Sequence, residues 1–442
     1  MTDVLARPEP AGSAFLEELR DWLTDNWDPD LTVAQWWERL GLAGWAAPTL
    51  PTESYGRGLS RADAGRVSQE IARFGALGAP AGLGMLLAAP TIATHGSREQ
   101  IDAYVRDIVT GQKAWCQLFS EPGAGSDLAG LTTRAVKDGD EWVVDGQKVW
   151  TSGGQYADMG MLLARTNSEV PKHQGITYFA LDMHQPGVEV RPLREMTGHA
   201  MFNEVFFTAA RVADAAVIGG VNNGWAVANT TLMNERAGLG AGGGGGGGFG
   251  AMPGTVADNL ARRAGDFVRA AGDSQAARRG GGRRGGQATM LINLARENGK
   301  IADPTIRQDL ARLHTYGEVA RYNSERQKAA REAGQDIPGM ANIAKLSMSH
   351  IVRLSRDLGL RIIGPHGMLH GYDDAGRKSL DQATGKPFYA MVTGSALSAQ
   401  APPIYGGTDQ VQRNIIGERV LGLPKEPSND RVVPFSELPR NA

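Results

Sequence analysis

Residues 138–146 decide the fold, and they read Asp138-Gly139-Asp140-Glu141-Trp142-Val143-Val144-Asp145-Gly146. The apolar residues in this stretch stand between two Asp-Gly pairs, and such pairs beside an apolar run are typical of tight β-hairpin turns. Two later runs, 176–181 and 204–207, contain the aromatic and β-branched residues that strands favour. The pattern predicts a small antiparallel β domain over residues 115–220.

Helical periodicity surrounds this β domain on both sides. Apolar residues between Phe15 and Leu23 recur at the three- and four-residue spacing of one helix face, and similar patterns continue to about residue 112. Helical periodicity returns at Trp225 and runs through two long segments, about 304–333 and 339–362. We therefore predict an α+β multidomain protein with an N-terminal helical domain (1–114), the middle antiparallel β domain (115–220) and a C-terminal four-helix bundle (221–442).

Glycine is in excess, with 59 residues in a chain of 442, where an average composition would give about 7%. Residues 238–286 hold 18 of them, including seven consecutive glycines at 242–248. Such a tract loses too much backbone entropy on ordering to form a helix or a strand. We predict a flexible, glycine-rich insertion over about 238–286, with an amphipathic helix at 256–271.

The net charge and the cysteine content exclude some classes of partner and indicate a cellular compartment. The formal net charge of −2 indicates no nucleic-acid partner, which would require a concentrated basic face. Cys116 is the sole cysteine and cannot form an intramolecular disulfide, so a small buried side chain in a cytoplasmic protein is expected. The uncharged stretch 75–96 is interrupted by Pro80 and Pro90, which favours a buried helix of a bundle over a membrane span.

Common catalytic and nucleotide-binding motifs are missing. His366 and His370 have the spacing of two metal ligands on a helix, but they lack the acid of H-E-x-x-H and Gly367 interrupts the helix, so no metal is expected. No strand is followed by G-x-G-x-x-G, and there is no P-loop. Taken alone, the glycine-containing segment 120–127 predicts only a tight turn.

Specific information comes from five segments taken in order. They are Gly44-Trp45-Ala46-Ala47-Pro48 with Glu53 and Gly56; Thr91-Ile92-Ala93-Thr94-His95-Gly96; Glu121-Pro122-Gly123-Ala124-Gly125-Ser126-Asp127; Gly146-Gln147-Lys148-Val149-Trp150-Thr151-Ser152-Gly153-Gly154; and Ile404-Tyr405-Gly406-Gly407-Thr408-Asp409-Gln410-Val411-Gln412-Arg413-Asn414. In their order and spacing, and in the α–β–α pattern around them, they resemble the acyl-CoA dehydrogenase family of flavoproteins.

The resemblance implies that FAD and an acyl-CoA lie between the domains of a homodimer or homotetramer, with an electron-transfer flavoprotein as the electron acceptor. The residues that it places at the flavin are Gln117, Leu118, Phe119, Ser120, Gly125, Ser126, Trp150, Thr151, Ser152, Thr408 and Gln410. It places Arg361, Gly364 and Pro365 near the FAD of a neighbouring subunit. Arg296 is a further candidate, although the Phe of the family's Arg-x-x-Phe-Gly segment is missing here.

The family removes an α-proton from a thioester and transfers the β-hydrogen to the flavin as hydride, which requires a carboxylate base. Many members place that Glu where this chain has Gly406. A second branch, similar to the isovaleryl and long-chain enzymes, places it on the first C-terminal helix before an Arg, and here Glu235 precedes Arg236. Glu235 is therefore the predicted base, with an ordinary surface acid as the alternative interpretation.

The backbone N–H of Gly406 is predicted to polarise the thioester carbonyl, so Gly406 counts as catalytic beside Glu235. Its missing side chain predicts space for a branched or bulky acyl group. The predicted substrate-binding residues are Ser126, Met233, Asn234, Arg236 and Gly407.

Two other functions remain open at this point. One is a flavin monooxygenase or nitroalkane-type oxidase of the same fold. The other is a catalytically inactive partner subunit of a heteromeric dehydrogenase, which would bind no FAD.

Overall fold

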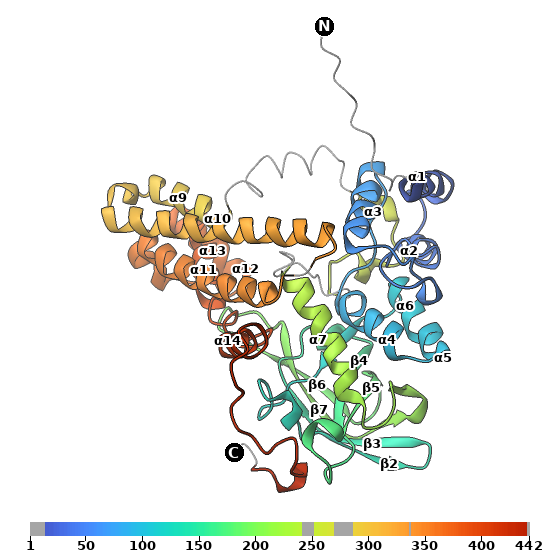
Figure 1. Cartoon of the computed structure of the whole chain (residues 1–442). Coiled ribbons are helices and arrows are strands. Elements are labelled where there is room, and N and C mark those ends of the chain that lie inside the picture. Colours follow the sequence, from blue (N-terminus) through green and yellow to red (C-terminus); the bar gives the residue numbers. More distant parts are fainter. Residues whose placement is uncertain (1–13, 241–251, 269–285, 336, 440–442) are drawn as a thin grey trace.

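A computed structural model describes residues 14–240, 252–268, 286–335 and 337–439 (Figure 1). Helices, a sheet and then more helices follow one another along the chain, which confirms the predicted fold class. The sheet and the N-terminal helices lie together, and the C-terminal helices extend to one side of them. Among the described residues, no helix is long and apolar enough to cross a membrane.

The N-terminal region is helical, as predicted. Its helices are α1 (Ala14–Asn26), α2 (Val33–Leu42), α3 (Arg61–Phe74), α4 (Ala89–His95), α5 (Arg98–Gln100) and α6 (Arg106–Val109), with π-turns at Gly84–Ala88 and Ile101–Val105. Helix α2 begins at a capping box formed by Thr32 and Gln35. Its Trp36 is buried and donates its indole N–H to the carbonyl of Leu77 at 2.7 Å, which satisfies a buried donor and ties α2 to the segment after α3.

The central sheet has eight strands in the order β6-β7-β3-β2-β4-β5-β8, with β1 beside β4. The strands are β1 (Trp115–Leu118), β2 (Arg134–Asp138), β3 (Glu141–Lys148), β4 (Met159–Arg165), β5 (Ile176–Asp182), β6 (Val188–Leu193), β7 (Phe202–Ala213) and β8 (Val217–Ile218). Most pairs are antiparallel, but β4 pairs in parallel with β1 and β2, so the sheet is mixed and the prediction of a wholly antiparallel domain is wrong on this point. Parallel neighbours need a long connection, and the β2–β3 hairpin lies between β1 and β4 in sequence.

The two Asp-Gly pairs of the opening stretch differ in structure. Gly139 has φ +60° and forms the predicted tight turn between β2 and β3. The prediction of a second turn is wrong, because Asp145 and Gly146 lie inside β3, where the register with β7 shifts between Val144 and Gly146. Gly146 has φ +152° and backs onto Thr133, so it serves a β-bulge rather than a hairpin.

Gly146→Ala is expected to lower the free energy of unfolding by about 1–3 kcal/mol. A Cβ at this position would meet Thr133 Oγ1 at 2.5 Å and Thr133 Cα at 2.7 Å, and the backbone would also be strained. Urea unfolding measures the change. Gly78→Ala is the matched control, because a Cβ on Gly78 meets nothing within 4 Å; equal stability of the two variants would contradict this explanation of the bulge.

The C-terminal region is also helical. Its helices are α7 (Gly224–Gly240), α9 (Gly286–Glu297), α10 (Pro304–Glu332), α11 (Met340–Ile363), α12 (Asp374–Thr384), α13 (Tyr389–Ser398) and α14 (Asp409–Ile415). The two long predicted segments are confirmed as α10 and α11. Helices α9, α10, α11 and α13 enclose a second hydrophobic core that contains Leu291, Leu310, Leu358 and Val392.

The helix predicted over 256–271 is wrong where the structure describes it. Short 3-10 turns at Ala257–Asn259 and Ala264–Phe267 replace it, and residues 269–271 lie outside the described residues, as does the glycine run 242–248. The segment instead crosses the start of α2, where the Val33 N–H donates to the Arg262 carbonyl at 2.9 Å. Tertiary contacts with the N-terminal region therefore override the helical periodicity of this segment.

Candidate active site

Helix α7 packs against three parts of the molecule: β5, the helices around α4, and α11. Val227 and Thr231 are fully buried. The Thr231 hydroxyl lies 2.9 Å from the Thr91 hydroxyl, so the rotation of α7 about its axis is fixed. Residues four apart share a helix face, and Glu235 is therefore on the same inward face one turn later.

Glu235 lies at the end of this face, beside strand β1. The Gln117 side-chain amide donates to Glu235 Oε2 at 3.4 Å, and Gln117 belongs to the segment predicted to line the flavin. Burial raises the pKa of the Glu235 carboxyl above its usual range, although the Gln117 bond and the neighbouring Arg236 act in the opposite direction. A desolvated carboxylate of this kind is suited to accept a proton. The role of Glu235 as the base stays a prediction, and its half-buried position distinguishes it from a fully exposed surface acid.

The segment after β1 forms an open turn. The backbones of Glu121 and Ala124 are bonded to each other at 2.9 and 3.1 Å, and Gly123 between them and Gly125 after them are exposed. A Cβ built on Gly123 or Gly125 would meet nothing within 4 Å, and Ser126 is exposed. The turn is therefore open at Gly125 and Ser126, where a ligand can approach. In the same segment Leu118 and Phe119 are buried, while Ser120 is only partly buried.

Trp150 follows β3 with a left-handed backbone, φ +61°, which is rare for a bulky residue. Its side chain is 62% exposed, an unusual environment for a tryptophan, and its ring meets Phe202 edge-on at 5.9 Å. The next residue, Thr151, exchanges backbone hydrogen bonds of 3.0 Å with Asn203 and is completely buried. Ser152 is partly buried beside it. This backbone conformation leaves the indole ring of Trp150 exposed at the surface.

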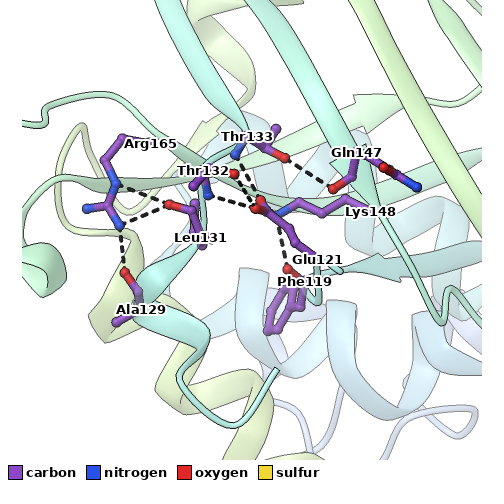
Figure 2. Close-up of polar contacts among 9 residues, drawn as sticks. All are labelled: Phe119, Glu121, Ala129, Leu131, Thr132, Thr133, Gln147, Lys148 and Arg165. Atoms are coloured by element: carbon purple, nitrogen blue, oxygen red, sulfur yellow. Dashed lines mark hydrogen bonds and ion pairs between the residues drawn. The ribbon is translucent and has the colours of Figure 1, made fainter. Parts of the chain in front are cut away.

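These two segments are joined by a buried ion pair that sequence analysis missed (Figure 2). Lys148 is fully buried and its Nζ lies 2.8 Å from Glu121 Oε1 and 2.9 Å from the Phe119 carbonyl oxygen. The Glu121 carboxylate also accepts from the backbone N–H groups of Thr132 and Thr133 and from the Thr132 hydroxyl. Burial alone would raise the pKa of Glu121, but Lys148 and these donors hold it at about 2.

The residues present fit a flavin. Its flat, largely apolar ring needs an aromatic or apolar wall and nearby hydrogen-bonding groups. Trp150 offers an exposed indole, and the open turn with Gly125 and Ser126 offers backbone groups. Ser152, which is partly buried beside Trp150, adds a hydroxyl near this surface, whereas the Thr151 hydroxyl has no hydrogen-bond partner among the described residues but is completely buried.

The segment with Gly406 forms a tight turn before α14. Gly406 and Gly407 have φ values of +63° and +76°, so both are in the left-handed region that favours glycine. The Gln412 amide donates to both of their carbonyl oxygens, at 2.9 and 3.2 Å. Thr408 caps α14 through its hydroxyl, which accepts from Val411 N–H at 3.1 Å. The absence of a side chain at Gly406 therefore also has a backbone cause.

The other predicted cofactor residues lie on or beside the C-terminal helices. Arg361 forms an ion pair with Asp309 and donates to the Thr305 hydroxyl at 2.8 Å. Gly364 has φ +59° and ends α11, with Pro365 exposed after it; Arg296 and Gln410 are exposed as well. Contact of Arg361, Gly364 or Pro365 with a cofactor of a neighbouring subunit stays a prediction.

The predicted substrate residues of α7 border the N-terminal helices. Met233 is 63% exposed, and Asn234 accepts a hydrogen bond of 3.4 Å from Arg61 of α3. Arg236 is partly buried and close enough to Arg419 for their charges to interact, which places the segment after α14 beside α7.

A hollow of about 400 Å³ next to the start of α7 contains further basic residues that sequence analysis missed. Its lining residues are Pro171, His173, Gln174, Trp225, Asn229, Arg419 and Arg431. The neighbouring Lys172 pairs with Asp127 at 2.9 Å and with Asp430 at 2.7 Å. Because Asp127 follows Gly125 and Ser126 in the open turn, these ion pairs connect the surroundings of the hollow to that turn. No local motif marks Arg419 and Arg431, because folding brings them beside residues 171–174 and α7 from a distant part of the chain.

Comparison with protein families assigns each part of this architecture. The models described as Acyl-CoA dehydrogenase N-terminal, middle and C-terminal domain match residues 13–112, 116–210 and 283–421. The chain belongs to the acyl-CoA dehydrogenase family and is a flavin-dependent oxidoreductase that acts on a CH–CH bond.

Individual relatives sharpen this placement. The chain is 32% identical over 429 residues to acyl-CoA dehydrogenase IpdE1 of Mycobacterium tuberculosis, covering 93% of this chain and 98% of that protein. It is 50% identical to acyl-CoA dehydrogenase FadE34 of the same organism over 200 residues, which are 45% of this chain and 28% of that protein. The solved Tcur3481-Tcur3483 steroid ACAD is similar with a TM-score of 0.65 and 25% identity, over 95% of this chain and 99% of that one.

Proposed function

We propose that this chain oxidises a branched or bulky acyl-CoA to the 2-enoyl-CoA, with FAD as cofactor and Glu235 as the base. The observation that carries the proposal is the half-buried carboxylate of Glu235 on the inward face of α7, one hydrogen bond from Gln117 in the proposed flavin segment. When bound, FAD would supply the acceptor for the β-hydrogen, which leaves the substrate as hydride. The segments of Gln117 and Trp150 would hold the flavin, and Glu235 would take the α-proton.

Charge supports a CoA thioester as the substrate. CoA carries several phosphates, and guanidinium groups are well suited to phosphate oxygens. Arg236 follows the proposed base directly, and Arg419 and Arg431 line the adjacent hollow. We infer that these arginines and His173 bind the CoA portion, while Ser126, Met233, Asn234 and Gly407 lie along the acyl and pantetheine path.

The size of the acyl group is inferred from Gly406 and from the names of relatives. Gly406 contributes no side chain and can offer its backbone N–H to the thioester carbonyl. The names of similar proteins include a steroid ACAD, and a (2S)-methylsuccinyl-CoA dehydrogenase of Cereibacter sphaeroides that is 35% identical over 196 residues. Both names describe substrates larger or more branched than a short straight acyl chain.

Titration with acyl-CoAs tests the proposal. We expect the purified protein to be yellow from bound FAD, and its flavin absorbance to bleach without oxygen when a branched or ring-bearing acyl-CoA is added. Straight butyryl-CoA, in the same assay, should bleach it at least tenfold more slowly, the discrimination that one or two well-placed methylenes provide. Faster bleaching by butyryl-CoA would contradict the bulky acyl group.

The alternatives give distinct results in the same experiment. A colourless protein that binds no FAD would indicate an inactive partner subunit. Oxygen consumption with a substrate that lacks CoA would indicate an oxidase or monooxygenase. An electron-transfer flavoprotein as acceptor and a homodimer or homotetramer remain part of the proposal, although a relative in structure is the ChsE4-ChsE5 complex of Mycobacterium tuberculosis (TM-score 0.63, 25% identity).

A further inference from the structure

We propose that the buried Glu121–Lys148 pair is a positioning device, which fixes the open glycine turn against the segment that presents Trp150. It rests on the proposed flavin site, because it concerns the two segments that would hold the flavin. Neither residue is itself placed in contact with the cofactor.

A side-chain contact and a backbone contact join the end of β3 to the segment after β1. Lys148 Nζ reaches the Phe119 carbonyl oxygen and the Glu121 carboxylate, both in the segment after β1. One residue further along, the Val149 N–H donates to the Ser120 carbonyl at 2.9 Å. A side-chain bond and a backbone bond therefore hold the end of β3 against the segment that runs into Gly125 and Ser126.

The carboxylate adds a third attachment. Both oxygens of Glu121 are used: Oε1 accepts from Lys148 and the Thr133 N–H, and Oε2 accepts from the N–H and the hydroxyl of Thr132. Figure 2 shows Glu121 at the centre of these bonds. The start of β2 is thereby fixed to the same point, so three chain segments share one buried centre.

The expected energy of this buried ion pair indicates that it mainly sets the positions of the chain segments and adds little to stability. A buried ion pair often adds little net stability relative to well-packed apolar residues, because both charges lose their hydration. Its directional bonds, by contrast, determine where each segment lies. Trp150 needs such support, because its left-handed backbone is unfavourable for a bulky residue and persists only where the surroundings impose it.

The test uses the full-length protein and the double variant Glu121→Gln/Lys148→Met, which removes both charges together. We expect a thermal midpoint close to that of wild type. The dissociation constant for FAD, measured by titrating the apoprotein, should rise about tenfold or more, since small displacements of binding groups are costly. The absorbance band of the bound flavin should also shift, because the indole of Trp150 no longer lies in the same place.

Controls separate this inference from the proposed function. Lys137→Met/Asp214→Asn removes an exposed ion pair of the same sheet, 2.5 Å long, and should leave both FAD readouts unchanged. Lys148→Arg keeps the charge but alters the geometry, and it should weaken FAD binding even if the double variant does not fold. The inference is overturned if Lys148→Arg, and any double variant that folds, bind FAD with wild-type affinity and show the wild-type flavin absorbance spectrum. Unfolding of both would also overturn it, because the pair would then be needed for the fold itself. If wild type binds no FAD, the proposed function fails and the inference with it.

Discussion

Glu235→Gln should slow the bleaching of the flavin by acyl-CoA by about 10²–10⁴-fold, the usual contribution of a general base. The amide has nearly the shape of the carboxylate and can still contact Gln117, but it cannot accept the α-proton. Stopped-flow absorbance under anaerobic conditions measures the rate. Glu17→Gln, at an exposed position of α1, is the matched control and should bleach like wild type.

The pH dependence gives a second signature of Glu235. Burial raises its pKa, so the bleaching rate should fall as the pH decreases through a value above 4.5. The same shift has the opposite consequence for stability, because a folded protein with a raised carboxyl pKa loses stability as the pH rises through that pKa. Glu235→Gln should therefore keep or raise the thermal midpoint at pH 7. Unchanged bleaching in a well-folded variant would refute Glu235 as the base.

Lys148→Met alone should lower the free energy of unfolding by about 3–5 kcal/mol at neutral pH, because it leaves the Glu121 carboxylate buried without its counter-ion. Adding Glu121→Gln should restore most of this loss, since the double variant no longer buries an unpaired carboxylate. Urea unfolding of the two variants and wild type measures both effects. If the single and double variants were equally unstable, the lost stability would come from packing and not from an unpaired charge.

The stability of the protein at acidic pH should also depend on the Glu121–Lys148 pair. The pKa of Glu121 is about 2 in the folded protein and near its ordinary value of 4.5 when the chain unfolds. A carboxyl with a depressed folded pKa stabilises the protein above the unfolded pKa and loses that contribution as the pH falls through the folded pKa. Wild type should therefore lose this stability between about pH 4.5 and pH 2, and Glu121→Gln should lack this component.

Local sequence signals predicted those parts of the structure that depend on neighbouring residues. The turn at Gly139, helices α10 and α11 and the order of helical and β regions follow from spacing and turn chemistry along the chain. The inward orientation of Glu235 agrees with its position one turn after Thr231. Its proposed role was inferred from resemblance, because spacing alone does not distinguish a base from a surface acid.

Long-range contacts explain what the sequence did not predict. Asp145-Gly146 has the composition of a turn, but pairing with β7 and contact with Thr133 make it a bulge. Glu121 and Lys148 both lie in the quoted motifs, yet nothing in either motif shows that they bond to each other across 27 positions. Residues 256–268 have helical periodicity, but contacts with the start of α2 determine their conformation.

The anchoring of α7 has a consequence for how such a protein can diverge. The contacts that orient the proposed base involve residues 227 to 235, and the glycine-rich sequence begins at residue 238. Loop closure becomes only slowly more costly with length, at about 0.6 kcal/mol for each doubling. Insertions and deletions beyond the end of this helix can therefore accumulate over evolutionary time while the chemistry upstream is inherited unchanged.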